Sequence, residues 1–149
     1  MSEPSGLETH LGYWLRCVSN HVSHAFALKL AGAGVTVAEW VVLRELYDSE
    51  SAPSALAERL GMTRGAISKL ADRLVAKAMI VRRAEGRDRR FQSLALTPQG
   101  RAILPKLAAL ADRNDAEFFD SVDIETRQAI LRAMKAIVRR KGLRGAPVG

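Results

Sequence analysis

Basic side chains gather in one stretch of this 149-residue sequence, and the chemistry open to such a cluster is the binding of phosphate groups. Residues 62–101 contain ten lysines and arginines but three acidic residues, which gives this segment a net charge of +7. The whole chain also has a net charge of +7, so the remainder is neutral. A nucleic-acid-binding surface concentrates charge in this way, whereas a uniformly basic protein does not.

A second group of chemically useful side chains recurs at steps of three or four residues near the N-terminus. Its members are His10, Tyr13, Trp14, Cys17, His21 and His24. His21 and His24 could share a metal ion, but the sequence offers no third ligand, so we expect no metal site. Cys17 could act as a thiol switch, although a small buried hydrophobe is its commoner role. The aromatic and histidine side chains more often belong to a core, an interface or a solvated face.

Catalytic chemistry is not indicated. An enzyme needs a nucleophile, a base and an oxyanion-stabilising group that converge, or a bound metal. The three histidines instead lie within fifteen residues on one expected helix, and there is no glycine-rich phosphate loop. We therefore expect neither an enzyme nor a cofactor.

The length and composition of the chain indicate in which compartment the protein works. A chain of this length builds one domain, and its single cysteine forms no internal disulfide. The N-terminal residues include no apolar run, and nowhere do 18 uncharged apolar residues follow one another. The sequence predicts a reduced, cytoplasmic protein without a membrane segment.

The apolar residues follow a helical period over most of the chain and an alternating period over one short part. Helices are expected at about 7–30, 37–47, 53–61, 63–77, 98–119 and 124–141. Thr36 and Glu39 are spaced as a capping box, and Pro105 should kink the fifth helix. Two strands, 80–83 and 92–96, should form a hairpin. The fold class is therefore mainly α with a small β hairpin.

Residues 53–72 have the spacing of a helix-turn-helix. Two helices that meet at a wide angle need a small residue where they touch, here Ala57, and a residue free to turn left-handed between them, here Gly61. Ile67 and Leu70 should fasten the second helix to the core. Its other face carries short or basic residues suited to a major groove. These candidate DNA contacts are Thr63, Arg64, Gly65, Ser68, Lys69 and Arg73.

The expected hairpin follows this second helix directly, and its loop, residues 84–90, is basic. A basic hairpin in this position is typical of a wing that reaches the minor groove or the phosphate backbone. An exposed charged tip, an ordinary helical bundle and a winged-helix module that binds proteins are the alternatives. The helix-turn-helix and the basic hairpin together favour DNA binding.

Three segments carry a family resemblance: residues 37–43 (VAEWVVL), residues 56–61 (LAERLG), and DRR at 88–90 followed by LALTPQG at 94–100. They resemble the multiple antibiotic resistance regulator (MarR) family, and the likeness spans the whole chain. The resemblance implies a winged helix-turn-helix, residues 35–97, embedded in a helical dimerisation domain, residues 1–34 and 98–142, with a flexible tail, 143–149. It also implies a homodimeric transcription regulator on a pseudo-palindromic operator in double-stranded DNA, most often a repressor.

The resemblance assigns roles within the wing by motif position. Asp88 would brace the wing, Arg90 would enter the minor groove, and Arg87 and Arg89 would contact phosphates. This sequence departs from the family where a glycine usually follows the recognition helix, because it has Ala78 there. A left-handed Ala78 would cost about 1 kcal/mol, or else the helix ends differently.

Many members of the family release DNA when a small aromatic compound binds between the dimerisation helices and the winged domain. The candidate effector-binding residues here are His10, Tyr13, Trp14, Cys17, Trp40 and Arg44. The peroxide-sensing branch has its cysteine nearer the start of the first helix, close to Gly12, so the resemblance does not give Cys17 that role. A thiol-responsive regulator that uses Cys17 remains the alternative.

Overall fold

The computed structural model describes residues 2–84 and 92–144, which form six α-helices, a short 3-10 helix and one two-stranded antiparallel sheet. In chain order these are η1 (Leu7–Thr9), α1 (Leu11–Ala31), α2 (Val37–Asp48), α3 (Pro53–Leu60), α4 (Arg64–Ala76), β1 (Ile80–Ala84), β2 (Gln92–Leu96), α5 (Pro98–Phe119) and α6 (Ile124–Lys141). The fold class expected from the sequence, mainly α with a small β hairpin, is confirmed.

The start of the first helix differs from the expectation. His10 has an extended backbone, with φ of −93° and ψ of 124°, and separates η1 from α1. The indole Nε1 of Trp14 donates a hydrogen bond to the carbonyl of Glu8 at 2.9 Å and so holds η1 against the first turn of α1. Helical spacing alone did not reveal this break. Pro105 lies inside α5, which continues through it as one element.

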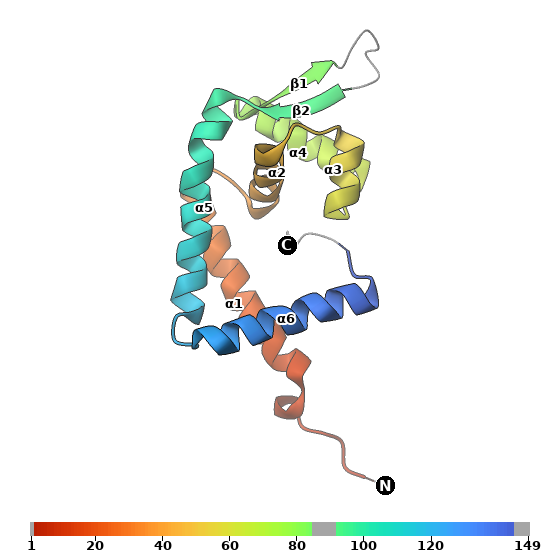
Figure 1. Cartoon of the computed structure of the whole chain (residues 1–149), viewed down its shortest axis with the longest axis vertical. Coiled ribbons are helices and arrows are strands. Elements are labelled where there is room, and N and C mark those ends of the chain that lie inside the picture. Colours follow the sequence, from red (N-terminus) through yellow and green to blue (C-terminus); the bar gives the residue numbers. More distant parts are fainter. Residues whose placement is uncertain (1, 85–91, 145–149) are drawn as a thin grey trace.

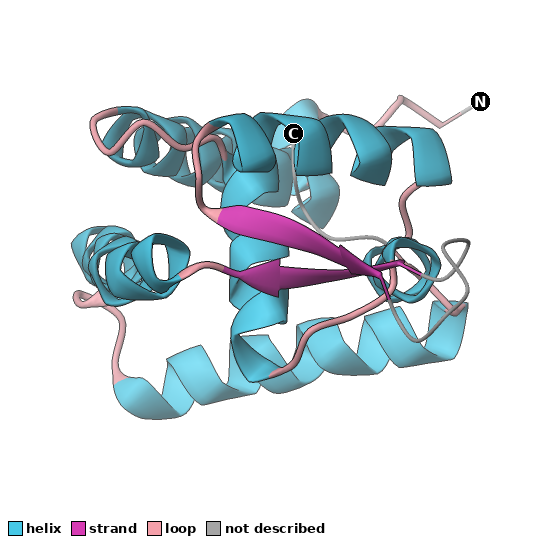
Figure 2. Ribbon diagram, turned by 90° about the horizontal axis from the view of Figure 1, so that it is seen from above, coloured by secondary structure: helices cyan, strands magenta, loops and turns pink. Residues whose placement is uncertain are grey.

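The elements form a compact lobe and a set of long helices (Figure 1). The helices α2, α3 and α4 gather beneath the hairpin, and α5 leads from β2 to the far end of the molecule. Seen from above, the hairpin lies over the helices of this lobe (Figure 2). The last helix, α6, leaves the end of α5 as a separate arm, and none of its residues is buried.

A polar cluster fastens α1 to α5. The Asn114 side chain is 4% exposed, accepts a hydrogen bond from Lys29 Nζ at 2.9 Å and donates one to the Val22 carbonyl at 3.1 Å. Lys29 also forms an ion pair with Glu117 at 2.8 Å. A buried amide needs partners, and here both of its ends have one. This cluster fixes the position of the two long helices relative to each other.

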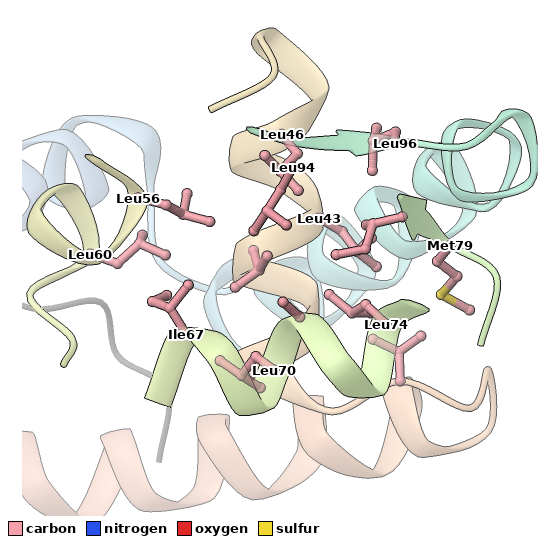
Figure 3. Close-up of a cluster of buried hydrophobic side chains, with 14 of the residues drawn as sticks. Leu43, Leu46, Leu56, Leu60, Ile67, Leu70, Leu74, Met79, Leu94 and Leu96 are labelled. Carbon is pink, nitrogen blue, oxygen red and sulfur yellow. The ribbon is translucent and has the colours of Figure 1, made fainter. Parts of the chain in front are cut away.

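One hydrophobic core holds the lobe together and reaches α5 (Figure 3). Leucines dominate it, and the helices contribute them at steps of three or four residues, as their amphipathic spacing requires. Its labelled members are Leu43, Leu46, Leu56, Leu60, Ile67, Leu70, Leu74, Met79, Leu94 and Leu96. Because strand β2 supplies Leu94 and Leu96, the hairpin is anchored in the same core as the helix-turn-helix.

Candidate nucleic-acid interface

The second helix of the predicted helix-turn-helix, α4, is oriented by its buried face. Gly61 has φ of 65° and turns the chain after α3, and the Thr63 hydroxyl caps α4 by accepting from the Ala66 N–H at 3.1 Å. Ile67 and Leu74 are fully buried, as the sequence predicted for Ile67. All six candidate DNA contacts on this helix-turn-helix are exposed; they are Thr63, Arg64, Gly65, Ser68, Lys69 and Arg73.

Gly65 lies in the first turn of α4 without a packing reason to be glycine. A Cβ added there would meet no atom of the described residues within 4 Å, and no positive φ is recorded. Glycine costs a helix about 1 kcal/mol relative to alanine. A residue that weakens the fold without compensation inside the fold points to a contact outside it.

The charges around α4 differ in their partners. Arg64, Lys69 and Arg73 form no ion pair with another residue of the ranges that the structure describes. Of the arginines on β1, however, Arg82 pairs with Asp72 of α4 at 2.8 Å, and Arg83 lies 3.6 Å from Glu50. The carboxylates therefore hold the hairpin to the lobe and leave the outer face of α4 positive.

A single-residue bridge from the α2–α3 connection contacts the middle of β2, and the sequence does not predict it. Ser51 exchanges two backbone hydrogen bonds with Leu94, at 3.1 and 2.8 Å. Glu50 next to it accepts a hydrogen bond from the buried Ser93 hydroxyl at 2.8 Å. These bonds fasten the α2–α3 connection to β2, and no local residue pattern indicates them. The wing-tip residues of the prediction, Arg87, Asp88, Arg89 and Arg90, lie outside the described residues.

The corner between α4 and the hairpin shows how the recognition helix ends without the usual glycine. Ala78 is left-handed, with φ of 60°, and the helix end is a Schellman motif in which Met79 N–H donates to the Leu74 carbonyl and Ala78 N–H to the Val75 carbonyl. The helix therefore ends as it would with glycine, and alanine bears the strain. The same corner holds α5, because Thr97 donates from its hydroxyl to the Ala78 carbonyl at 2.7 Å and from its N–H to the Met79 carbonyl at 3.0 Å.

Replacing Ala78 by glycine should therefore stabilise the protein. The substitution removes the penalty of a left-handed alanine, about 1 kcal/mol, and this gain is partly offset by the greater freedom of glycine in the unfolded chain. We expect urea unfolding to show an increase of about 0.5 kcal/mol in stability. Ala76→Gly, in the last turn of α4, is the control and should lower it. A decrease for Ala78→Gly would mean that the strain is absent.

A fully buried carboxylate lies behind α4. The side chain of Glu39 completes the predicted capping box, since its Oε1 accepts from the Thr36 N–H at 2.9 Å while the Thr36 hydroxyl accepts from the Glu39 N–H. Lys77 Nζ lies 2.9 Å from Oε1 and 2.8 Å from Oε2. Burial raises the pKa of Glu39, but the hydrogen bonds from Lys77 and Thr36 outweigh it and hold the pKa below its ordinary value. This pair stabilises the fold near neutral pH and loses its effect as acid protonates Glu39.

The sequence and the fold of this chain are similar to those of known proteins. Residues 33–90 match the sequence profile described as MarR family. An uncharacterised HTH-type transcriptional regulator of Bacillus cereus is 31% identical over 124 residues, which are 79% of this chain and 80% of that protein. The chain belongs to the MarR family. It is a DNA-binding transcription regulator and not an enzyme.

Further relatives and solved structures agree with this MarR-family fold. The HTH-type transcriptional repressor YetL of Bacillus subtilis is 30% identical over 90 residues, 58% of this chain and 54% of YetL. A variant of MarR from E. coli complexed with operator DNA superposes with a TM-score of 0.77 at 22% identity, covering 86% of this chain and 93% of that one. BpsR of Bordetella bronchiseptica gives 0.79 at 21% identity, covering 91% and 97%. The fold of this regulator is thus a winged helix-turn-helix.

The predicted effector-binding residues of this MarR-family regulator are not brought together within one chain. His10, just before α1, and Tyr13, Trp14 and Cys17 in its first turns are exposed, and Tyr13 and Trp14 pack edge to face. The expectation that Cys17 is a small buried hydrophobe is therefore wrong for the single chain. Trp40 instead packs edge-on against Phe26, with ring centres 6.4 Å apart. Arg44 forms an ion pair with Asp48 at 3.1 Å and lies 5.5 Å from the centre of the Tyr47 ring.

The described residues contain neither a metal-binding cluster nor a membrane-spanning helix. Among 2–84 and 92–144, histidine, cysteine and carboxylate side chains do not gather in groups of three or more that could hold a metal ion. Within the same ranges, the helices are too short or too polar to span a bilayer.

Proposed function

We propose that this regulator works as a homodimer that places two α4 helices in successive major grooves of a pseudo-palindromic operator and represses transcription until a small aromatic effector binds. The outer face of α4 carries the proposal. It presents Arg64, Lys69 and Arg73 without ion pairs in the described part of the chain, beside a glycine that the fold does not require. Ser68 and Thr63 add short polar groups that suit base edges and phosphates.

The wing completes this interface by motif position. We assign Arg90 to the minor groove, Arg87 and Arg89 to phosphates, and Asp88 to bracing the loop. The described base of the wing supports this assignment, because its strands pair from Ile80 with Leu96 to Ala84 with Gln92 and are anchored in the core. The ends of the two strands, Ala84 and Gln92, therefore belong to a hairpin that the core holds in place.

Dimerisation is supported by apolar side chains on the terminal helices. Those on η1 and α1 are Leu7, Leu11, Tyr13, Trp14, Leu15 and Val18, and those on α6 are Ile124, Ile130, Leu131, Met134, Ile137 and Val138. All are at least 42% exposed in the single chain. Exposed apolar side chains in this number mark an interface, and a twofold dimer covers them with the same residues of the second copy.

Gly65→Ala tests the interface because its two expected effects have opposite signs. Alanine should raise the free energy of unfolding by about 0.5–1 kcal/mol, since it favours the helix and meets no neighbour. The added methyl group should nevertheless weaken operator binding, because it stands where DNA backbone approaches. Binding is measured by gel shift on a site selected from random duplexes, and stability by urea unfolding.

Arg64→Ala is the companion variant, and Arg113→Ala on α5 is the matched loss of one exposed arginine. Of these two arginine variants, only Arg64→Ala should weaken operator binding strongly. Equal operator binding by wild type and Gly65→Ala would remove Gly65 from the interface. Failure of the wild type to prefer any duplex would instead refute DNA recognition and favour a protein-binding winged helix.

The effector proposal rests on relatives and on Arg44. One related structure concerns the regulation of DNA binding of BpsR by 6-hydroxynicotinic acid, and another is CouR from Rhodococcus jostii bound to p-coumaroyl-CoA. Here the partner of Arg44 is the exposed Asp48. An exposed ion pair contributes at most about 1 kcal/mol, so the carboxylate of a ligand can replace Asp48.

Salicylate-like compounds should quench the fluorescence of Trp14 or Trp40 and should bind more weakly when operator DNA is present. Arg44→Ala should weaken this binding about tenfold, and Cys17→Ala should leave it unchanged. If affinity is the same in Arg44→Ala and with operator present, these residues serve only the fold. A response to peroxide that Cys17→Ala abolishes would favour the thiol-responsive alternative.

A further inference from the structure

The Glu39–Lys77 pair joins three parts of the chain, namely the start of α2, the end of α4 and the turn that follows α1. Glu39, which is 0% exposed, belongs to the first turn of α2. Lys77 is the C-cap residue of α4, immediately before the left-handed Ala78. Its Nζ also donates a hydrogen bond to the carbonyl of Gly34 at 2.8 Å. Gly34 lies in the turn that ends α1 and has φ of 77°.

This arrangement is more specific than fold stability requires. Burying the Glu39 carboxylate is costly, and the side chain of its partner Lys77 stays 37% exposed, so their attraction is weaker than that between two buried charges. Oε2 of Glu39 has no directional hydrogen bond from any described residue and is compensated only by the nearby Lys77 charge. What the pair does supply is a fixed position for the end of α4. Because Lys77 donates to Glu39 of α2 and to Gly34 of the turn after α1, it fixes the end of α4 relative to both.

We propose that Glu39 and Lys77 are positioning residues for DNA recognition. They hold the C-terminal end of α4 and the start of the hairpin against the end of α1, so that the position of α1 sets the direction in which recognition helix and wing enter DNA. Neither residue belongs to the candidate DNA contacts. The inference rests on the proposed function, since it concerns how that interface is aimed.

Charge provides a sharp test, because the two residues have opposite signs. Glu39→Gln removes a negative charge, and Lys77→Met removes a positive one. If the charges acted only through the electrostatic field on DNA, Glu39→Gln would strengthen binding and Lys77→Met would weaken it. If the pair positions α4, both variants should lower the ratio of operator to random-duplex affinity, each by about tenfold. The double variant should lose little more than either single one.

The measurement is fluorescence anisotropy with the selected operator and with a random duplex, below the melting temperature of every variant as checked by circular dichroism. Glu58→Gln on α3 and Lys106→Met on α5 repeat the charge changes at exposed positions and should leave the ratio unchanged. Lys77→Arg keeps the positive charge, and its ratio should equal that of the wild type.

Opposite shifts for the two variants, or an unchanged ratio in folded variants, would overturn the proposal. A variant that is unfolded at the assay temperature is replaced by Lys77→Arg, for which wild-type anisotropy and a wild-type ratio are expected, and by Glu39→Asp, whose shorter side chain should lower the ratio. If Glu39→Asp keeps the wild-type ratio, positioning is also refuted. A wild type without sequence preference would refute the proposed function instead.

Discussion

Gly100→Ala should destabilise the protein by about 3 kcal/mol or more, enough to unfold much of it at moderate temperature. A Cβ at this position would lie 2.0 Å from the carbonyl oxygen and 2.9 Å from the carbonyl carbon of Met79. Both atoms belong to backbone, so no side chain can rotate out of the way. Relief requires α5 to move away from the corner, which would break the Thr97 hydrogen bonds to Ala78 and Met79.

Thermal unfolding followed by circular dichroism measures this effect. Gln99→Ala serves as control, because Gln99 lies in the same turn of α5 but is exposed, and its replacement should shift the midpoint by little. A Gly100→Ala protein that melts within two degrees or so of wild type would show that α5 can be displaced without cost. It would also mean that the hydrogen bonds from Thr97 to Ala78 and Met79 do not fix α5 to this corner.

Met134→Glu should convert the proposed homodimer into a monomer and thereby abolish operator binding. Met134 is 42% exposed at the middle of the apolar face of α6, and in the proposed dimer a glutamate there would bury an unpaired charge. The wild type should elute at twice its 16.3 kDa and the variant at 16.3 kDa in light scattering. A monomer holds one half-site, so operator affinity should fall by several orders of magnitude.

Ala129→Glu is the matched control for this substitution. Ala129 lies on the same helix, roughly 140° around its axis from Met134, and is exposed. The added charge is identical, and the dimer should persist. A dimeric Met134→Glu protein, or a monomeric wild type at micromolar concentration, would contradict the proposed assembly.

Elements set by neighbouring residues could be predicted from the sequence, and contacts across the chain could not. Capping and helical spacing identified α2, α4, α5 and α6 to within a residue or two, because both patterns act over three or four residues. The left-handed turn at Gly61 followed from the same local logic and is confirmed.

The structure added links between distant residues. Glu39 and Lys77 are 38 residues apart, and Glu50 and Ser93 are 43 apart. Each residue taken alone is typical of a solvated surface, so nothing in the sequence distinguishes its partner. The exposed face of α4 could be predicted together with its buried face, because one helical period defines both. The candidate effector residues are predicted from their side-chain types and from the family resemblance, and they do not lie together in a single chain.

The ion pairs of β1 also affect how salt acts on DNA binding. Affinity falls with salt because each phosphate that a cation neutralises releases condensed counterions, about 0.9 of an ion per contact on duplex DNA. Arg82 and Arg83 already face the carboxylates of Asp72 and Glu50. A cation that keeps a carboxylate partner displaces few ions from DNA. The formal charge of +7 on residues 62–101 therefore overstates the salt sensitivity that we expect for this regulator, because in the proposed interface it comes from the α4 cations that form no ion pair among the described residues and from the assigned arginines of the wing.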